Sequence, residues 1–351
     1  MHAKIAYVYQ WATFGGVERV LINRAEAFRQ YRIPVKLFIY FYADAGGLTA
    51  LKTYIKRHKL DEFIEVVHEF HPNQYDIVFS IDTPQLLTEH YDLTNRVIFE
   101  CHTPYINNRQ YLLTLPPTLR ALVVPSKTFR DRISSEAPSF SDKLFVLRNF
   151  VPWDIHQENT ELELPKWARR PIVYLGRVDI LKNVIELLDG FVYFQKNYGN
   201  DLILVIAGPV SPDVNLEQEL KMRGLTGRSV WIPPIGFDQV PRFLNAMRKK
   251  SAVFVSCSRG ESFGLSVAEA ISITLPVLIS DIPEHLKLVC NDPDCIYRLG
   301  NPESLAHNLF VLINKYEEKS KAMVEYRKKF SAYSFIEDWR ILSSEIGIGL
   351  A

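Results

Sequence analysis

Cysteine is scarce in this sequence, and that scarcity excludes a disulfide-stabilised fold. The 351 residues include 4 cysteines, Cys101, Cys257, Cys290 and Cys295. Small domains that depend on disulfides are much richer in cysteine, so we interpret these as free thiols of a cytoplasmic protein. Cys290 and Cys295 could form half of a metal site, but no second cysteine or histidine pair lies near them in the sequence. We therefore predict no metal there.

Long apolar runs and an excess of charge of one sign are also missing. The longest apolar run, LFIYFYA at residues 37–43, is far too short to cross a bilayer. The first residues, MHAKIAYVYQW, enter a strand-like pattern without the apolar region of a secretory signal. A net charge of +1 argues against a nucleic-acid partner. No G-x-G-x-x-G follows an expected strand, which disfavours a dinucleotide-dependent oxidoreductase.

What the sequence does contain is a series of short apolar runs separated by helical patterns. Most runs are continuous rather than alternating, as in strands that are buried on both faces of a parallel sheet. Examples are KIAYVY, DIVFSID and VIFECH in the first half, and PIVYLG, LILVIAG and AVFVSCS in the second. The segment NVIELLDGFVYFQKN (183–197) repeats apolar residues at helical spacing. This alternation predicts two doubly wound, Rossmann-like α/β domains that face a central cleft.

The expected domains meet at a charged segment with several prolines and no clear period. We place the first domain at residues 1–152, the linker at 153–170 and the second domain at 171–330. The tail, about 331–351, is expected to pack back on the first domain. Ligands of open α/β sheets bind outside the carboxyl ends of the strands, so functional residues are expected there.

Two cations precede an expected helix in YLGRVDILKNVIELL (174–188). Arg177 and Lys182 follow a strand, and Asn183 opens a helix in which Glu186 would complete a capping box. Cations are unfavourable at a helix N-terminus because that end carries partial positive charge. An anion bound by both cations and the backbone N–H groups would remove the conflict. The alternative is a pair of solvated surface charges.

Two glutamates stand out in SRGESFGLSVAEA (258–270). Glu269 has an ordinary explanation, because Ser266 and Glu269 have the spacing of a capping box. Glu261 has none, since it follows a buried strand directly. The N–H groups that open the next helix offer an anion site, where Gly264 lets the backbone approach a ligand closely. Two carboxylates beside an anion site suit an extended, polyhydroxylated ligand with an anionic middle, such as a nucleotide sugar.

Three motifs together resemble glycosyltransferase family 4. They are Glu261-x7-Glu269, Gly176-Arg177-x4-Lys182 and Gly15-Gly16-Val17-Glu18. The similarity extends over nearly the whole chain and includes PVLISDIPEHLKLV at residues 276–289. The resemblance implies the GT-B fold and a retaining, metal-independent hexosyltransferase. It implies a nucleotide-sugar donor, a UDP-sugar, and an acceptor hydroxyl on a glycan or a lipid-linked sugar, in polysaccharide or cell-envelope glycan synthesis.

The resemblance also assigns roles to residues. Glu261 would contact hydroxyls of the donor sugar, and Glu269 the hydroxyls of the ribose. Arg177 and Lys182 would bind the pyrophosphate and stabilise the leaving nucleotide. His102, in ECHTPY after a buried strand, would lie near the reacting centre, although a histidine at a strand end is as often structural. The other expected donor-binding residues are Gly15, Gly16, Gly208, Phe237, Asp238, Val240, Ser262, Phe263, Gly264 and Leu265.

Asp292-Pro-Asp294 spells the DxD pattern that holds a metal in other glycosyltransferases. Here Arg177 and Lys182 would already supply the positive charge that a metal provides. The resemblance therefore implies no metal and no other cofactor.

One expected helix raises the question of location. LKTYIKRHKLDEF (51–63) sets Leu51, Tyr54 and Ile55 against several basic residues. It is either an ordinary solvated helix or a contact with an anionic membrane surface, which would place the protein peripherally at the inner face of a membrane.

Two other functions fit the same donor site. A nucleotide-sugar epimerase or hydrolase on the same fold would consume donor without an acceptor. A non-catalytic partner would bind nucleotide sugar and support another transferase, but loss of a charged donor residue would be expected in it. Arg177, Lys182, Glu261 and Glu269 are all present, which argues against this second alternative.

Overall fold

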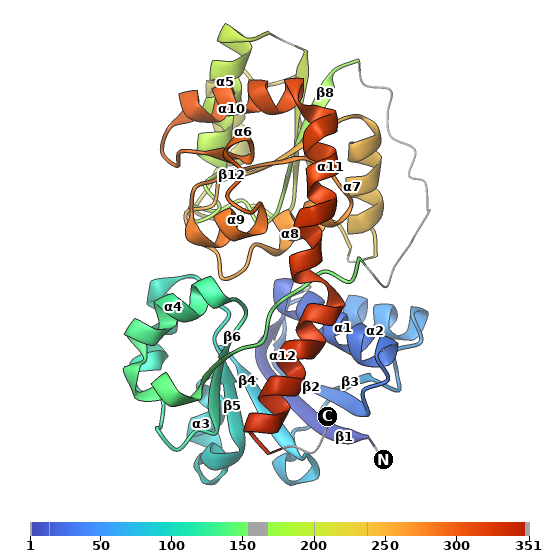
Figure 1. Cartoon of the computed structure of the whole chain (residues 1–351), viewed down its shortest axis with the longest axis vertical. Helices are drawn as coiled ribbons and strands as arrows, with labels where there is room; N and C mark the ends of the chain where they lie inside the picture. Colours follow the sequence, from blue (N-terminus) through green and yellow to red (C-terminus); the bar gives the residue numbers. More distant parts are fainter. Residues whose placement is uncertain (1, 14, 154–167, 200, 237, 348–351) are drawn as a thin grey trace. The chain divides into compact units, whose positions relative to one another are not determined.

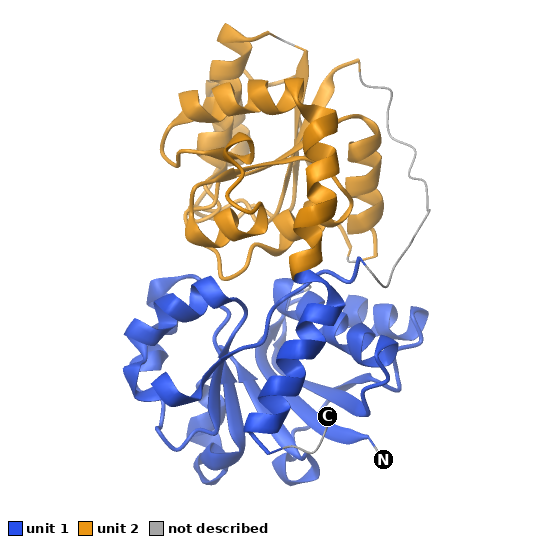
Figure 2. Cartoon of the chain, viewed as in Figure 1, with its two compact units in different colours: residues 1–157, 330–351 blue, residues 158–329 orange. Residues whose placement is uncertain are grey.

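The chain divides into two compact units, residues 1–157 with 330–351 and residues 158–329 (Figure 2). The computed structural model describes residues 2–13, 15–153, 168–199, 201–236 and 238–347. Most of the segment expected as a linker, 154–167, lies outside the described residues. The residues from 330 onward belong to the first unit although they follow the second in the sequence.

The first unit is built on a seven-stranded parallel sheet in the order β3-β2-β1-β4-β5-β6-β7 (Figure 1). Its strands are β1 (Ala3–Ala12), β2 (Val35–Asp44), β3 (Ile64–Val67), β4 (Ile77–Ile81), β5 (Val97–Glu100), β6 (Ala121–Val124) and β7 (Leu144–Val146). Its helices are α1 (Gly16–Gln30), α2 (Leu48–Arg57), α3 (Gln85–Glu89), α4 (Lys127–Glu136) and α12 (Ala332–Glu345). Short 3-10 helices are η1 (Pro72–Gln74), η2 (Tyr91–Arg96), η3 (Ile106–Leu113) and η4 (Pro138–Lys143). The strand order reverses between β1 and β4, where doubly wound sheets bind ligands.

Helix α12 completes the hydrophobic core of the first unit. Its Phe335 and Trp339 are fully buried. The Trp339 ring lies 5.0 Å from that of Phe28 in α1, and the Phe335 ring lies 4.9 Å from that of Phe150. Large aromatic side chains bury much apolar surface, so the last helix of the chain is a core element of the unit that begins the chain.

The second unit contains a six-stranded parallel sheet in the order β10-β9-β8-β11-β12-β13. Its strands are β8 (Arg170–Leu175), β9 (Leu202–Ala207), β10 (Ser229–Ile232), β11 (Val253–Ser256), β12 (Val277–Ser280) and β13 (Ile296–Tyr297). Its helices are α5 (Val184–Asn197), α6 (Leu216–Met222), α7 (Val240–Lys249), α8 (Leu265–Ser272), α9 (Pro283–Leu288), α10 (Pro302–Asn314) and α11 (Tyr316–Tyr326), and η5 (Pro293–Cys295) precedes β13. η6 (Arg327–Phe330) spans the boundary between the units in the sequence. The two parallel sheets confirm the predicted fold class.

Both predicted capping boxes are wrong. Asn183 precedes α5 with a left-handed backbone (φ 57°), and its side chain caps no backbone N–H but donates to the carboxylate of Glu186. Helix α8 begins at Leu265, one residue before Ser266, so Ser266 cannot be its N-cap. The N-cap is Gly264, which also has a left-handed backbone (φ 92°). Neither helix start therefore has the side-chain cap that the spacing favoured.

The helix considered for membrane contact, α2, turns its apolar residues into the protein. Leu51, Tyr54 and Ile55 are buried in the first unit, while Lys56 and Arg57 are exposed. The apolar side that a bilayer would require is therefore covered by the chain itself. Within the described residues, no helix has both the length and the apolar character needed to cross a membrane.

The burial of α12 leads to a stability prediction. Trp339→Ala removes a fully buried indole and should lower the free energy of unfolding of the first unit by about 3–5 kcal/mol. Tyr333→Ala, on the same helix but 51% exposed, is the matched control and should change it by less than about 1 kcal/mol. Urea unfolding followed by circular dichroism measures both. Equal effects of the two substitutions would contradict the placement of α12 in the core.

Candidate active site

The two predicted cations of the second unit lie in the loop after β8, and each has a carboxylate partner. Arg177 Nε is 2.6 Å from Asp179 Oδ2, and Lys182 Nζ is 2.6 Å from Glu261 Oε1. Asp179 also accepts the backbone N–H of Lys182 at 2.7 Å, which fixes the turn. In the structure without ligand, the protein therefore balances both cations with its own carboxylates, and the predicted anion site remains a prediction. Asp179 was missed because its partners become visible only in the folded loop.

Glu261 lies at the carboxyl end of β11 and is almost completely buried. Its Oε1 accepts hydrogen bonds from Lys182 Nζ and, at 2.7 Å, from Ser258 Oγ. Burial alone would raise the pKa of Glu261, but the charge of Lys182 and these two hydrogen bonds outweigh it and lower the pKa. Glu261 is therefore ionised near neutral pH and acts as a hydrogen-bond acceptor. The structure thus brings together two of the predicted site residues, Lys182 and Glu261.

A buried polar chain supports the Glu261 loop from β12 and α9. Ser280 Oγ donates to the backbone oxygen of Ser258 at 2.7 Å and lies 3.0 Å from His285 Nδ1. His285 is fully buried, and burial, opposed in part by the charge of Glu261, lowers its pKa to about 4. It is therefore neutral at pH 7. No local pattern indicated this role, because His285 lies 24 positions after Glu261 and follows a different strand.

Two predicted glycines are required by their surroundings. Gly264 has φ 92°, and a Cβ there would lie 3.1 Å from Leu288 Cδ1. Gly208 has φ 138°, and its Cβ would lie 2.1 Å from the backbone oxygen of Gly176. The ends of β8 and β9 can therefore approach each other only because neither end carries a side chain at this point.

The remaining predicted donor residues of the second unit also follow strand ends. Ser262 and Phe263 lie between β11 and α8, Leu265 is the first residue of α8, and Glu269 is a buried residue of the same helix. Asp238 and Val240 follow β10, where Val240 is the first residue of α7. Phe237 lies outside the described residues.

In the first unit, the predicted glycine loop joins β1 to α1. Glu18 closes this loop, because its carboxylate accepts the backbone N–H of Thr13 at 2.5 Å and that of Gly15 at 3.0 Å. Gly15 is the N-cap of α1, and Gly16 is its exposed first residue. Backbone N–H groups at such a helix start can bind an anion.

His102 follows β5 and is held at both its ring and its backbone. Its Nε2 lies 2.7 Å from Glu100 Oε2, and its backbone N–H donates to Asp82 Oδ1 at 3.0 Å. Asp82, at the end of β4, adopts a left-handed backbone (φ 44°), a conformation that is uncommon for residues other than glycine. Sequence reasoning missed both carboxylates, although Glu100 and His102 are two residues apart and so point to one face of the extended chain.

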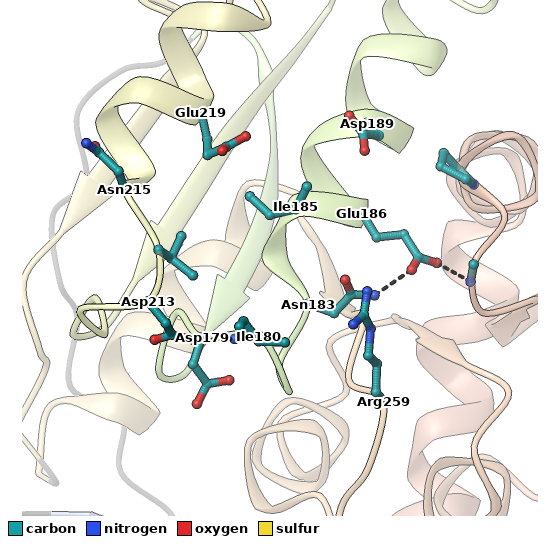
Figure 3. Close-up of a pocket in the computed structure, with 13 residues that line it drawn as sticks. Asp179, Ile180, Asn183, Ile185, Glu186, Asp189, Asp213, Asn215, Glu219 and Arg259 are labelled. Atoms are coloured by element: carbon teal, nitrogen blue, oxygen red, sulfur yellow. Dashed lines mark hydrogen bonds between the residues drawn. The ribbon is translucent and has the colours of Figure 1, made fainter.

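A pocket of about 400 Å³ in the second unit is lined in part by the loops that follow β8 and β11 (Figure 3). Its lining includes the carboxylates of Asp179, Glu186, Asp189, Asp213 and Glu219, against one cation, Arg259. Neither Arg177 nor Lys182 lines it. The pocket therefore does not coincide with the expected pyrophosphate site.

The two aspartates of the DxD pattern are engaged in ion pairs. Lys319 Nζ is 2.9 Å from Asp292 Oδ2 and 2.7 Å from Asp294 Oδ2, and Tyr326 donates to Asp292 at 2.8 Å. Lys315 pairs with Asp294 at 2.8 Å. These aspartates therefore tie η5 to α11.

A family model and a curated relative each match part of this chain in sequence. Residues 163–330 match the family model described as "Glycosyl transferases group 1". A "Probable sucrose-phosphate synthase" of Thermosipho melanesiensis is 26% identical over 141 residues, which is 40% of this chain. The aligned segment spans 33% of the length of that relative.

Several solved structures resemble the whole chain. HepE of Anabaena, solved in complex with UDP and glucose, is similar with a TM-score of 0.77 at 16% identity, covering 98% of this chain and 100% of that one. Sucrose-phosphate synthase from Thermosynechococcus elongatus gives a TM-score of 0.72 at 13% identity, with 99% of each chain covered. A variant of S. aureus TarM gives 0.73 at 13% identity, covering 97% of this chain and 99% of that one. These identities are low, so the likeness establishes a shared fold.

The buried neutral histidine predicts a pH dependence of stability. The pKa of His285 is lowered from 6.5 to about 4 in the folded protein, so between these values the unfolded chain binds a proton that the folded protein does not. The free energy of unfolding should therefore fall as pH drops through this window, by up to the order of 3 kcal/mol. Urea unfolding between pH 7 and pH 4 measures the slope. His285→Asn should remove much of it, whereas His307→Asn, at an exposed position, should keep it; equal slopes in both variants would refute the assignment.

Proposed function

We propose that this protein is a retaining hexosyltransferase of family 4. The proposal is based on the match of the second unit to the group 1 glycosyltransferases and on the GT-B fold of the chain. It transfers a sugar from a UDP-sugar to a hydroxyl of a glycan or a lipid-linked acceptor. The observation that carries the proposal is the Lys182–Glu261 pair at 2.6 Å, which joins the loops after β8 and β11 within the matched region. The complex of HepE with UDP and glucose supports the choice of donor.

The charges of these loops suit departure of a nucleoside diphosphate. Negative charge develops on the leaving phosphate oxygen in the transition state, and Arg177 and Lys182 are fixed cations that would stabilise it. Asp179 and Glu261 hold the two cations in place before a donor binds, so little reorganisation is needed. Backbone N–H groups at the start of α8 add a second source of partial positive charge.

The carboxylates suit the neutral, hydroxyl-rich ends of the donor. Glu261 is ionised and would accept hydrogen bonds from sugar hydroxyls through its remaining lone pairs. Glu269 would accept from the ribose hydroxyls. In retaining transfer, the acceptor hydroxyl attacks on the face that the phosphate leaves, where Arg177 and Lys182 are expected. We place the reaction in polysaccharide or cell-envelope glycan synthesis on the cytoplasmic side.

Nucleotide release tests the function directly. The protein is incubated with a panel of UDP-, GDP- and ADP-sugars, with and without glycan and lipid-linked acceptors, and the released nucleotide is measured. Release that depends on an acceptor supports transfer, and the product's anomeric configuration by NMR tests retention. Equal release without an acceptor, or isomerisation of the donor, would favour the hydrolase or epimerase. Tight donor binding without turnover in any combination would favour the non-catalytic partner.

Substitution of Glu261 should mainly change kcat, whereas substitution of Glu269 should mainly change the affinity for UDP. Glu261→Gln should lower kcat on the order of 10²-fold and leave UDP binding nearly unchanged, because its contacts are to the transferred sugar. Glu269→Gln should weaken UDP binding by about 10–100-fold, since a charged acceptor for the ribose hydroxyls is lost. Glu217→Gln, an exposed glutamate of α6, is the control and should change neither quantity. Steady-state kinetics and calorimetric titration with UDP measure them; equal loss of UDP affinity in the first two variants would contradict this division.

Removal of divalent metal ions by a chelator should leave activity intact, because Arg177 and Lys182 would supply the positive charge that a metal provides. We expect full turnover in excess EDTA. Asp292→Asn should lower stability by about 1–3 kcal/mol through loss of charged hydrogen bonds with Lys319 and Tyr326, without changing kcat. Loss of activity in EDTA with recovery on adding Mn²⁺ or Mg²⁺ would overturn metal independence and make the DxD pattern the first place to search for the metal.

A further inference from the structure

A buried ion pair lies beneath the strand ends of the first unit and has no part in the function proposed above. Arg24 of α1 and Glu100 of β5 are both fully buried. Arg24 Nη1 donates to Glu100 Oε1 at 2.8 Å, and Nη2 donates to Oε2 at 3.1 Å. Such a two-pronged pair is geometrically specific as well as strong.

Stability alone does not account for this pair. The guanidinium lies 5.5 Å from the ring of Tyr7, to whose hydroxyl it donates at 3.0 Å, and 5.8 Å from the ring of Phe335, so aromatic side chains surround it and water does not reach it. Removing two charges from water is expensive, and apolar residues of similar volume often serve as well or better. The role of a buried pair in this position is therefore to be found in the groups that it holds in place.

Glu100 holds the ring of His102. Its Oε2 accepts from Arg24 and also lies 2.7 Å from His102 Nε2. Burial would raise the pKa of Glu100, but the charge of Arg24 and the hydrogen bond with His102 lower it to about 2. The carboxylate is therefore ionised and can only accept, so the proton of this hydrogen bond is on Nε2.

The opposite ring nitrogen of His102 remains available. Among the described residues, Glu100 is the only hydrogen-bond partner of the ring, and the residue is 8% exposed. The backbone N–H is held by Asp82, which also accepts the hydroxyl of Tyr111 at 2.5 Å. Ring and main chain are therefore both held by carboxylates, while Nδ1 has no hydrogen-bond partner among the described residues.

The same ion pair joins the two functional segments of the first unit. Arg24 is on α1, whose first turn carries the Gly15-Gly16 loop that Glu18 closes. Glu100 ends β5 and precedes His102. A displacement of α1 would therefore move the carboxylate that orients the histidine.

We propose that Glu100, held by Arg24, is a positioning residue that fixes His102 with its proton on Nε2, so that Nδ1 accepts a hydrogen bond from a substrate hydroxyl. The part that concerns substrate rests on the function proposed above. The part that concerns the ring is a property of the protein without ligand and is tested separately.

The first experiment is independent of activity. Two-dimensional proton–nitrogen spectra of the ¹⁵N-histidine-labelled full chain at pH 8 report which ring nitrogen carries the proton, and His102→Gln identifies the signal. We expect His102 as a single tautomer protonated on Nε2. In the double variant Arg24→Met with Glu100→Leu, which leaves no unpaired buried charge, we expect that single tautomer to be lost. A proton on Nδ1 in the wild type, or an unchanged tautomer in the double variant, would overturn the proposal.

The second experiment measures turnover. The double variant should retain its fold and lose about 10–100-fold in kcat, with donor KM changed by less than about threefold. The control, Arg148→Met with Asp338→Leu, removes another ion pair of the same unit, 2.5 Å long, and should keep kcat. His102→Asn places an amide near Nδ1, and His102→Gln places one near Nε2, so the asparagine variant should retain more activity.

The outcomes distinguish this proposal from the function on which it rests. A wild type that releases no nucleotide from any donor contradicts the proposed function, and the tautomer then decides the positioning role. An active wild type with an unimpaired double variant, or with glutamine better than asparagine at position 102, contradicts the positioning role and leaves the transferase function standing.

Discussion

The constraint on which both units depend is the parallel arrangement of their strands. Every parallel strand must be followed by a crossover, so each carboxyl end leads into a loop and then into a helix N-terminus. Loops after β8 and β11 therefore lie at one edge of the second sheet, and loops after β1, β4 and β5 lie at one edge of the first. Partial positive charge from the helices accumulates at the same edges. The protein has to place carboxylates there to hold cations that would otherwise be unfavourable, and Asp179 and Glu261 meet that need.

Order at these edges comes from buried partners that lie on neighbouring strands. Glu261 is supported through Ser258 and Ser280, and His102 through Glu100 and Asp82. Glu261 and His102, themselves largely buried, are thus each tied to a group that water does not reach. A low local dielectric strengthens these hydrogen bonds and makes an unpaired member costly, so the networks tend to persist as units. The site is consequently set by packing before any ligand arrives.

Much of this fold could be predicted from the sequence because local patterns determine it. The run LILVIAG contains β9, and the helical pattern at 183–197 begins one residue before α5 and ends at the same residue. Helix starts were less predictable, since Gly264 and Asn183 adopt left-handed backbone conformations that the spacing of capping residues does not reveal. The partners of the site residues were not predicted, because His285 and Lys182 meet the Glu261 loop from other strands. Arg24 did leave a signal: it shares a buried helical stripe with Val20 and Phe28, where a charge requires a partner.

The position of α12 in the core of the first unit has a consequence for biosynthesis. Residues 1–157 leave the ribosome long before Phe335 and Trp339 exist, so the first sheet emerges without the aromatic side chains that cover it. At ordinary rates of translation the delay is roughly 10–40 s. During that interval the second unit can fold as a closed insertion, while the first keeps an apolar face that attracts chaperones. In the nascent chain, the second unit should therefore complete its folding before the first unit does.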